Sequence, residues 1–446
     1  MIPQNCITQI DTPGVIMTNK ICSGILIGAS TLYACSAYAA GNSPQIENTD
    51  SGPLQIIISL SDQTVEVFRG DKIIATSNVS TGKQGHTTPM GVFSILEKKR
   101  KHRSNIYRNA PMPYMQRLTW SGIALHESRS VPAYPASHGC VRLPGAFAKT
   151  LFSMTSRGAH VVIAPRKIAP VSIEHANLFS PLNTPSAYYL TEEDLSGGPL
   201  ADSILASALL VPGTASAIDR QIDKLVAIPV GKRKPLRILI TRRNQRDLIR
   251  DAQLLLNELG YKAGEIDGLV GPATIRAIRK FREAEKNISK SGLITRKLIT
   301  LLYKKAKKGA VPTGQLFVRL GFKPVFSAPV VIKNPEIPLG THLLTVNAFD
   351  ASTQSSTWLS LKLEDRIYPK TRARLGLVDN TPEITAQTTI ASLDRIELSP
   401  KTRNRISRLL SPGSSLAISD KGISRETGLG TDFVVITNPL PVPKSS

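Results

Sequence analysis

The sequence predicts a multidomain protein with a mostly antiparallel β domain, a small three-helix module and an α+β C-terminal region. The chain has 446 residues, which is more than one domain usually holds. Short β-prone runs divided by turn residues fill residues 54–164, and helical periodicity is clearest over residues 243–305. Residues 311–446 mix both patterns. We expect a linker over residues 165–242, where proline, serine and alanine recur without a clear period.

Residues 1–39 resemble an export signal. Lys20 precedes an apolar run over residues 21–33, and Ala37-Tyr38-Ala39 places small residues where a signal peptidase cleaves. The run is too short to span a bilayer, which needs about 20 apolar residues. Met17 is an alternative start, because it opens a compact basic segment that ends at Lys20. An uncleaved signal anchor is the other alternative. We therefore expect an exported protein without a membrane span after cleavage.

The four cysteines divide into two groups. Cys6, Cys22 and Cys35 fall within the expected signal, and Leu32-Tyr33-Ala34-Cys35 has a weak likeness to a lipoprotein cleavage box. Cys140 is then the only cysteine of the exported chain. A lone thiol in an exported protein has no intramolecular disulfide partner, so a chemical role has to be considered for it.

Residues 54–164 read as strands with one helix. Three runs are separated by Ser61-Asp62 and Gly70-Asp71, which are typical of tight turns. The expected strands cover residues 54–60, 64–68, 72–76, 91–96, 122–125 and 160–163. We expect a helix over residues 145–156, where Phe147, Leu151 and Met154 share one face.

Residues 243–305 show the pattern of three short helices. Leu248, Ala252, Leu255, Leu256 and Leu259 form one apolar stripe that ends before a glycine. The next helix starts near Pro272, and a third is expected over residues 295–303. Beyond this module, strands are expected at residues 315–320, 330–332, 343–348, 358–363 and 433–437. One helix is expected there, capped by Ser399-Pro400.

The formal net charge is +23 and the pI is about 10.0, which indicates an anionic partner. Aromatic residues are only 5% of the chain, and no nucleic-acid motif is present in the sequence, so a nucleic-acid partner is not expected. An exported basic protein is more naturally matched to an anionic envelope polymer or a membrane surface.

His126 and Cys140 form a candidate base–nucleophile pair. His126 closes an expected strand, whereas Cys140 follows a loop of small and turn residues. An adjacent imidazole can accept the thiol proton and so make the sulfur nucleophilic. Gly139 allows a close approach of the backbone to a substrate, and nearby N–H groups could stabilise an oxyanion. Arg142 shares a face with Cys140 if the segment is extended, and could hold a carboxylate.

A zinc site is the main chemical alternative. His126, His138 and Cys140 offer three ligands, and Glu127 or His160 a fourth. The spacing lacks the usual paired-cysteine or paired-histidine pattern, so we expect no metal and no other cofactor.

Residues 136–143, Ala-Ser-His-Gly-Cys-Val-Arg-Leu, together with His126 resemble the signature of the L,D-transpeptidase catalytic domain. Thr81-Gly82-Lys83 and Thr88-Pro89-Met90-Gly91 are similar to an upstream stretch of that family. The resemblance covers about residues 54–164. One departure is Glu127-Ser128, where many members have glycine, and it alters the loop beside His126.

This resemblance implies a reaction on peptidoglycan. Cys140 would attack the carbonyl of the third stem residue, release the terminal D-alanine and form a thioester, which an amine acceptor would then resolve. His126 would be the general base, and Gly139 and Cys140 would supply oxyanion donors. His138, Ser137 and Arg142 would shape the site, and the resemblance places Tyr114 in the donor groove. The acceptor cannot be read from the residues, so an L,D-carboxypeptidase or amidase is an alternative. A catalytically inactive, wall-binding structural protein is another.

Residues 243–305 resemble the peptidoglycan-binding module that often accompanies cell-wall enzymes. The residues that carry the resemblance, and that we take as candidates for peptidoglycan binding, are Asp267, Gly268, Gly271 and Thr274. Val270 and Arg282 depart from the usual aromatic residue and glutamine. The expected partners are therefore peptidoglycan stem peptides and glycan, and the expected location is the periplasm at the cell wall. The oligomeric state and the role of residues 311–446 are not legible in the sequence.

Overall fold

The computed structural model describes residues 52–107, 109–181, 214–229, 232–285, 293–350, 355–378, 388–428 and 430–438. The expected export signal lies outside these residues. Within them, no helix is both long and apolar enough to cross a bilayer. The predicted fold class is confirmed, because the described chain has a mostly β region, a helical module and an α+β region.

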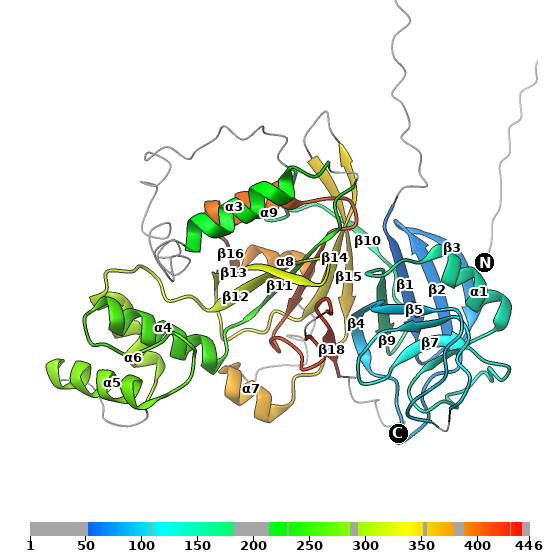
Figure 1. The fold of residues 1–446 in the computed structure, drawn as a ribbon, viewed down its shortest axis with the longest axis horizontal. Coiled ribbons are helices and arrows are strands. Elements are labelled where there is room, and N and C mark those ends of the chain that lie inside the picture. The colour runs from blue at the N-terminus through cyan, green and yellow to red at the C-terminus, as the bar shows by residue number, and fades with distance from the viewer. Residues whose placement is uncertain are drawn as a thin grey trace, which may run out of the picture. The chain divides into compact units, whose positions relative to one another are not determined.

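The first region is built on a six-stranded sheet in the order β18-β4-β9-β1-β2-β3 (Figure 1). Its strands are β1 (Leu54–Ser59), β2 (Thr64–Arg69), β3 (Lys72–Asn78), β4 (Met90–Ser94), β9 (His160–Ala164) and β18 (Val435–Thr437). All neighbouring strands are antiparallel except β1 and β9. The edge strand β18 comes from the far end of the sequence; a strand was expected over residues 433–437, but its pairing with β4 was not.

The central strands β1 and β9 of the six-stranded sheet are buried on both faces, whereas the edge strand β3 is largely exposed. In β1, Ile56 and Ile58 point into one core, which is completed by α1 (Gly145–Met154) and a second, smaller sheet. Ile57 points the other way, into a core shared with the α+β region. Successive side chains of a strand face opposite sides, so a continuous apolar run is what a doubly covered strand requires.

The smaller sheet carries the sequence motif. It has the order β5-β6-β7-β8, formed by β5 (Glu97–Lys99), β6 (Met115–Arg117), β7 (Ala124–Glu127) and β8 (Val141–Leu143). Strands β7 and β8 are parallel, with Leu125 opposite Val141 and His126 opposite Arg142. This pairing places the end of the loop that carries Cys140 beside the strand that carries His126.

The α+β region contains an eight-stranded sheet in the order β10-β15-β14-β17-β11-β12-β13-β16. Its strands are β10 (Val171–Ile173), β11 (Leu236–Arg242), β12 (Gly314–Leu320), β13 (Lys323–Ile332), β14 (Thr341–Asp350), β15 (Ser355–Leu363), β16 (Ile396–Glu397) and β17 (Ser415–Ser419). The helices are α3 (Thr214–Val226), α7 (Pro369–Leu375), α8 (Thr389–Asp394) and α9 (Pro400–Leu409). Apolar residues of α3, α8 and α9 cover one face of the sheet, and the six-stranded sheet covers the other.

The segment expected as a linker, residues 165–242, differs from that expectation where it is described. Strands β10 and β11 belong to the eight-stranded sheet, and α3 packs on it through the buried Ile222. The sequence pattern did not predict that this segment belongs to the α+β region, because its strands and helix are separated from one another along the chain. Residues 182–213 lie outside the described residues.

The helical module is an insertion in a β-hairpin. Its helices are α4 (Gln245–Glu258), α5 (Pro272–Ala284) and α6 (Arg296–Lys305). They lie between β11 and β12, which pair antiparallel up to Arg242 opposite Gly314. Arg243 N–H donates to the Thr313 carbonyl over 3.2 Å, so the two ends of the module are adjacent. Asn244 begins α4 with a capping box, and Leu255, Phe281 and Leu302 fill a separate small core.

Beside β18, polar contacts join the first region, which contains the six-stranded sheet, to the α+β region. The Arg237 guanidinium is buried, lies 3.3 Å from the Asp432 carboxylate, and donates to the Gly158 and Gly413 carbonyls. The His160 ring contacts Ser415 Oγ at 2.9 Å. Gly91 permits the approach of β18, because a Cβ there would lie 1.8 Å from the Val435 carbonyl oxygen.

We predict that Asp432→Asn lowers the free energy of unfolding by about 3 kcal/mol, because it leaves the buried Arg237 charge without a counter-charge. Urea denaturation of the chain lacking residues 1–39 measures this. Asp394→Asn is the matched control, since its carboxylate is 65% exposed and pairs with His175 at the surface. That control should cost less than about 1 kcal/mol. Equal losses in the two variants would contradict the prediction.

Candidate active site

Cys140, His126 and Arg142 line one cavity of about 120 Å³. The cavity lies between the loop that joins β5 to β6 and the loop that precedes β8. The lining also includes Ser137 and His138, which the sequence had singled out, together with His102 and Gly122. The structure therefore brings the predicted nucleophile, base and guanidinium together in one concave site.

The His126 imidazole is held by its own strand end. Its Nδ1 lies 2.7 Å from the Glu127 carbonyl oxygen, and that oxygen can only accept, so Nδ1 carries the proton. The neutral ring then presents Nε2 as a hydrogen-bond acceptor. Glu127 is the residue that departs from the family pattern, and the contact involves only its backbone.

The Cys140 thiol is partly exposed and has no disulfide partner. Its Sγ donates to the Gly122 carbonyl at 3.4 Å, and the Ala124 backbone also hydrogen-bonds to the sulfur. A thiol that donates a proton to a carbonyl is in its neutral form. The resting site therefore holds a protonated thiol beside a neutral imidazole.

The loop that carries Cys140 is fixed by the upstream motif. Thr88 Oγ1 accepts from Gly82 N–H and donates to the Gly139 carbonyl, each over 2.8 Å. The Thr81 carbonyl accepts from the Ser137 N–H, and Lys83 N–H donates to the Ser137 carbonyl. These contacts explain why two motifs so far apart in sequence belong to the same site.

Ser137 and Gly139 shape the turn before the thiol. Ser137 Oγ donates to the Cys140 carbonyl at 2.5 Å and accepts from Gly139 N–H at 3.1 Å. Gly139 has φ +109°, a conformation that strains any residue with a Cβ. The Gly139 N–H, expected as an oxyanion donor, is thus engaged with Ser137 in this conformation.

Burial tunes both members of the candidate pair toward neutrality. Burial lowers the pKa of His126 from its ordinary 6.5, and the positive charge of Arg142 acts in the same direction. The hydrogen bond to Glu127 opposes this shift. Burial also raises the pKa of the Cys140 thiol from its ordinary 9.0, against the effects of the Ala124 hydrogen bond and the charges of Arg117 and Arg142.

The loop between β5 and β6 supplies site residues that the sequence reasoning missed. Ile106 and Tyr107 line the cavity although both side chains are largely exposed. The Tyr107 hydroxyl donates to the His138 carbonyl at 3.4 Å, and the two rings lie 5.2 Å apart. The available signal was an aliphatic–aromatic pair within a strongly basic stretch.

The cavity is positively charged. Arg117 and Arg142 both line it, and none of its described lining residues carries a carboxylate. Arg117 is itself paired with Glu97 outside the lining, at 3.0 Å. His102, which the sequence did not place in the site, lines the cavity 3.5 Å from the Arg117 guanidinium. Such a lining favours an anionic ligand.

Two residues lie elsewhere than the sequence suggested. Tyr114, expected in the donor groove, is absent from the cavity lining and packs edge-on against Phe152 at 5.7 Å between ring centroids. Its position is set by the core, because it belongs to the apolar cluster that includes α1. His160, the alternative zinc ligand, lies in β9 and contacts Ser415 instead of the thiol.

The candidate binding residues of the helical module make internal contacts. The Asp267 carboxylate accepts from the Gln253 side chain and from Leu269 N–H, over 2.9 and 2.8 Å. Thr274 is buried, and its hydroxyl donates to the Ala263 carbonyl. Gly268 N–H donates to Gln253, and Gly271 is the N-cap of α5. These four residues hold the loop between α4 and α5 in shape.

Comparison with known families assigns both regions. Residues 53–163 match the family model of the L,D-transpeptidase catalytic domain. Residues 245–302 match the model described as "Putative peptidoglycan binding domain". Both matches agree with the resemblances that the motifs carry. These two domains indicate association with the cell wall.

Individual relatives match about a quarter of the chain. The chain is similar to the "Putative L,D-transpeptidase YkuD" of Bacillus licheniformis, with 26% identity over 130 residues, 27% of this chain and 72% of that protein. Solved L,D-transpeptidases from Mycobacterium smegmatis and Xylanimonas cellulosilytica are 21% and 27% identical, each with a TM-score of 0.24 and 25% coverage of this chain. The matched part spans 58% and 61% of those two chains.

In the chain lacking residues 1–39, we predict that ionisation of the Cys140 thiol and the rate of acylation of that thiol depend differently on pH. Thiolate absorbance in the ultraviolet should appear only above pH 9.0, because burial raises the Cys140 pKa. The acylation rate should still be undiminished at pH 6.5 and should fall only at lower pH. The reason is that His126 stays neutral until the pH reaches its lowered pKa. The Cys140→Ala variant gives the absorbance baseline. Thiolate absorbance at pH 7 would contradict the prediction, because it would show that Cys140 is already a thiolate in the resting protein.

Proposed function

We propose that this protein is a peptidoglycan L,D-transpeptidase that uses Cys140 as its nucleophile. The observation that carries the proposal is the single cavity lined by a thiol, a neutral imidazole and arginine side chains. The family match of residues 53–163 supports the reaction class. The protein acts outside the cytoplasm, at the periplasmic cell wall, to cross-link or remodel the wall and so to maintain cell shape.

The chemistry proceeds in two acyl transfers. His126 Nε2 accepts the thiol proton while Sγ bonds to the carbonyl carbon of the third stem residue. The bond to the terminal D-alanine breaks, and His126 returns the proton to the departing amine. An amine of a second stem then attacks the thioester, the carbon–sulfur bond breaks, and the thiol is restored. No metal or other cofactor takes part in these steps.

Backbone and side-chain donors stabilise the charges of the substrate. Because Gly139 N–H is engaged with Ser137, the Cys140 N–H is the donor that we assign to the oxyanion. Arg142, opposite His126 in the β7–β8 pair, binds a carboxylate of the stem. Ser137 and His138 keep the loop and its rim in place through the contacts described above.

We predict that Cys140→Ala abolishes cross-linking without a loss of stability, since the side chain loses a single sulfur atom. His126→Gln should lower the acylation rate about a hundredfold or more, as expected for a removed general base. Mass spectrometry of muropeptides after incubation with purified stem tetrapeptides measures both effects. It also identifies the acceptor, because water would yield trimmed peptides instead of dimers. Dimers formed by purified Cys140→Ala protein would overturn the mechanism.

The helical module is proposed to retain the enzyme on the wall. Its insertion between adjacent strand ends allows residues 244–312 to be replaced by an Asn-Gly turn, because Arg243 and Thr313 are already hydrogen-bonded. We predict that this variant still cross-links soluble stems but co-sediments less with purified sacculi. Wild-type co-sedimentation by the variant would assign wall binding to another region.

A further inference from the structure

A second and larger cavity lies where the helical module meets the α+β region. Its volume is about 760 Å³, which is within the range of sites for small ligands. Its walls come from the first turns of α4 and α6, the end of α7 and the loop after β17. Six cationic side chains line it: Arg242, Arg243, Arg246, Arg296, Arg374 and Lys421. Asp420 is the single carboxylate among the described lining residues.

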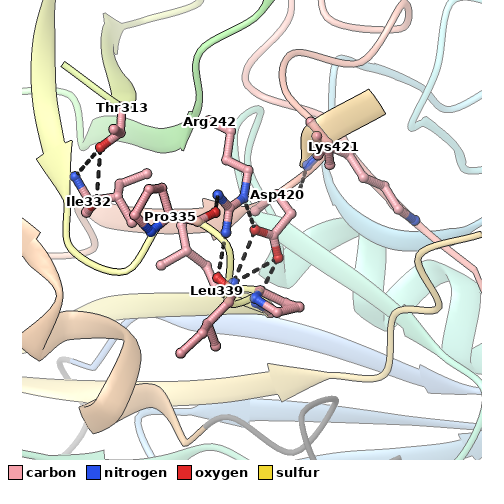
Figure 2. Close-up of polar contacts among 12 residues, drawn as sticks. Arg242, Thr313, Ile332, Pro335, Leu339, Asp420 and Lys421 are labelled. Carbon is pink, nitrogen blue, oxygen red and sulfur yellow. Dashed lines mark hydrogen bonds and ion pairs between the residues drawn. The ribbon is translucent and has the colours of Figure 1, made fainter. Parts of the chain in front are cut away.

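The floor of the cavity is a closed polar network (Figure 2). The Asp420 carboxylate accepts from Arg242 Nε at 2.5 Å and from the backbone N–H groups of Leu339 and Gly340. Arg242 also donates to the Pro335 and Ile337 carbonyls. Because these donors already occupy both oxygens of the Asp420 carboxylate, it has little capacity left to compensate the other cations that line the cavity.

Two further lining cations are compensated in the same way. Arg243 makes a bidentate pair with the buried Asp251 at 2.6 and 2.8 Å. Lys421 pairs with Asp365 (Figure 2 shows the lysine beside Asp420). These pairs fix the walls of the cavity and contribute little net charge to it.

Three arginines of the rim have no such compensation. Arg246, Arg296 and Arg374 are exposed and lie on α4, α6 and α7 respectively. Arg246 donates to the Asp267 carbonyl and Arg296 to the Leu375 carbonyl. Within the described residues none of the three forms an ion pair at 4.0 Å or less, although the exposed Asp267 carboxylate acts on Arg246 from a longer distance. Three like charges from separate elements thus converge on one cavity, where an anion would relieve their repulsion.

Helix geometry acts in the same direction. Asn244 and Thr295 cap α4 and α6, so both N-termini lie at the wall of the cavity. A helix N-terminus carries partial positive charge and favours an anionic group nearby. Aliphatic side chains line it as well, among them Leu248, Ile299, Val311, Leu375 and Ile423, beside polar residues such as Gln245 and Thr300. A ligand that fits has carboxylates and small apolar groups together.

We propose that this cavity binds a peptide carrying several carboxylates, and specifically the stem peptide of the wall polymer, an identification that rests on the proposed function. The planar guanidinium fork matches a carboxylate with two parallel hydrogen bonds. The aliphatic wall accommodates the alanine side chains of a stem, whereas a phosphate-rich polymer would leave it without a contact. The wall contact of the helical module is then made at its junction with the α+β region, and the α4–α5 loop supports it.

The test uses the chain lacking residues 1–39 with Cys140→Ala, so that no turnover occurs. One variant carries Arg246→Ala, Arg296→Ala and Arg374→Ala. Its control carries Arg279→Ala, Lys280→Ala and Lys297→Ala, which remove the same charge from exposed positions of the same module outside the cavity. Co-sedimentation with sacculi and calorimetry with a synthetic stem tetrapeptide are measured for each.

We expect the rim variant to bind sacculi and peptide about tenfold or more weakly, and the control to bind as the parent does. Amidation of the peptide carboxylates should weaken its binding to the parent but not further to the rim variant. Equal losses of binding in the two triple variants would show that only net charge matters, and would overturn the proposal. Displacement of the peptide by millimolar inorganic phosphate would also overturn it, in favour of a phosphate site.

Catalysis is scored separately in the chain that retains Cys140. The control variant should cross-link soluble stems at the parental rate, because its substitutions lie outside both cavities. A parent that forms no product from soluble stems would refute the proposed function and leave the binding result intact. A rim variant that binds sacculi normally would refute the binding site alone.

Discussion

The fold depends on a sheet whose two faces are both apolar. Ile56 and Ile58 of β1 pack toward the small sheet that carries the candidate site, and Ile57 packs toward the α+β region. Neither face can be left in water without exposing a large apolar area, which would cost about 25 cal/mol for each Å². The catalytic region and the α+β region are consequently joined by a common core, even though one matches a known family and the other region has no motif.

The candidate site inherits its order from this core. Strand β7 presents His126, and β8 presents Arg142. A hydrogen bond from Thr88 to the Gly139 carbonyl ties the loop that carries Cys140 to the upstream motif. Burial keeps both the imidazole and the thiol neutral, so the reactive thiolate has to be generated when substrate arrives. A neutral resting thiol is also less prone to oxidation than a thiolate.

Local patterns in the sequence predicted what depends on local physics. The apolar stripe located α4, and the string around Cys140, taken with His126, pointed to two side chains that line one cavity. The pairing of β18 with β4, and of β11 with β12 around an inserted module, leaves no local periodicity to detect. Tyr107 was missed because a loop residue has no pattern, and the packing of Tyr114 on Phe152 joins residues that are distant in sequence.

The strand β18 gives the molecule a built-in order of assembly. Its partner β4 is made early in synthesis, yet the edge that β4 offers is filled by a segment from far downstream, over the side-chain-free Gly91. A chain that crosses a membrane from its N-terminus would reach the far side with this edge still open. Under the proposed export, the six-stranded sheet would then be completed only after translocation of nearly the whole polypeptide, the helical module included.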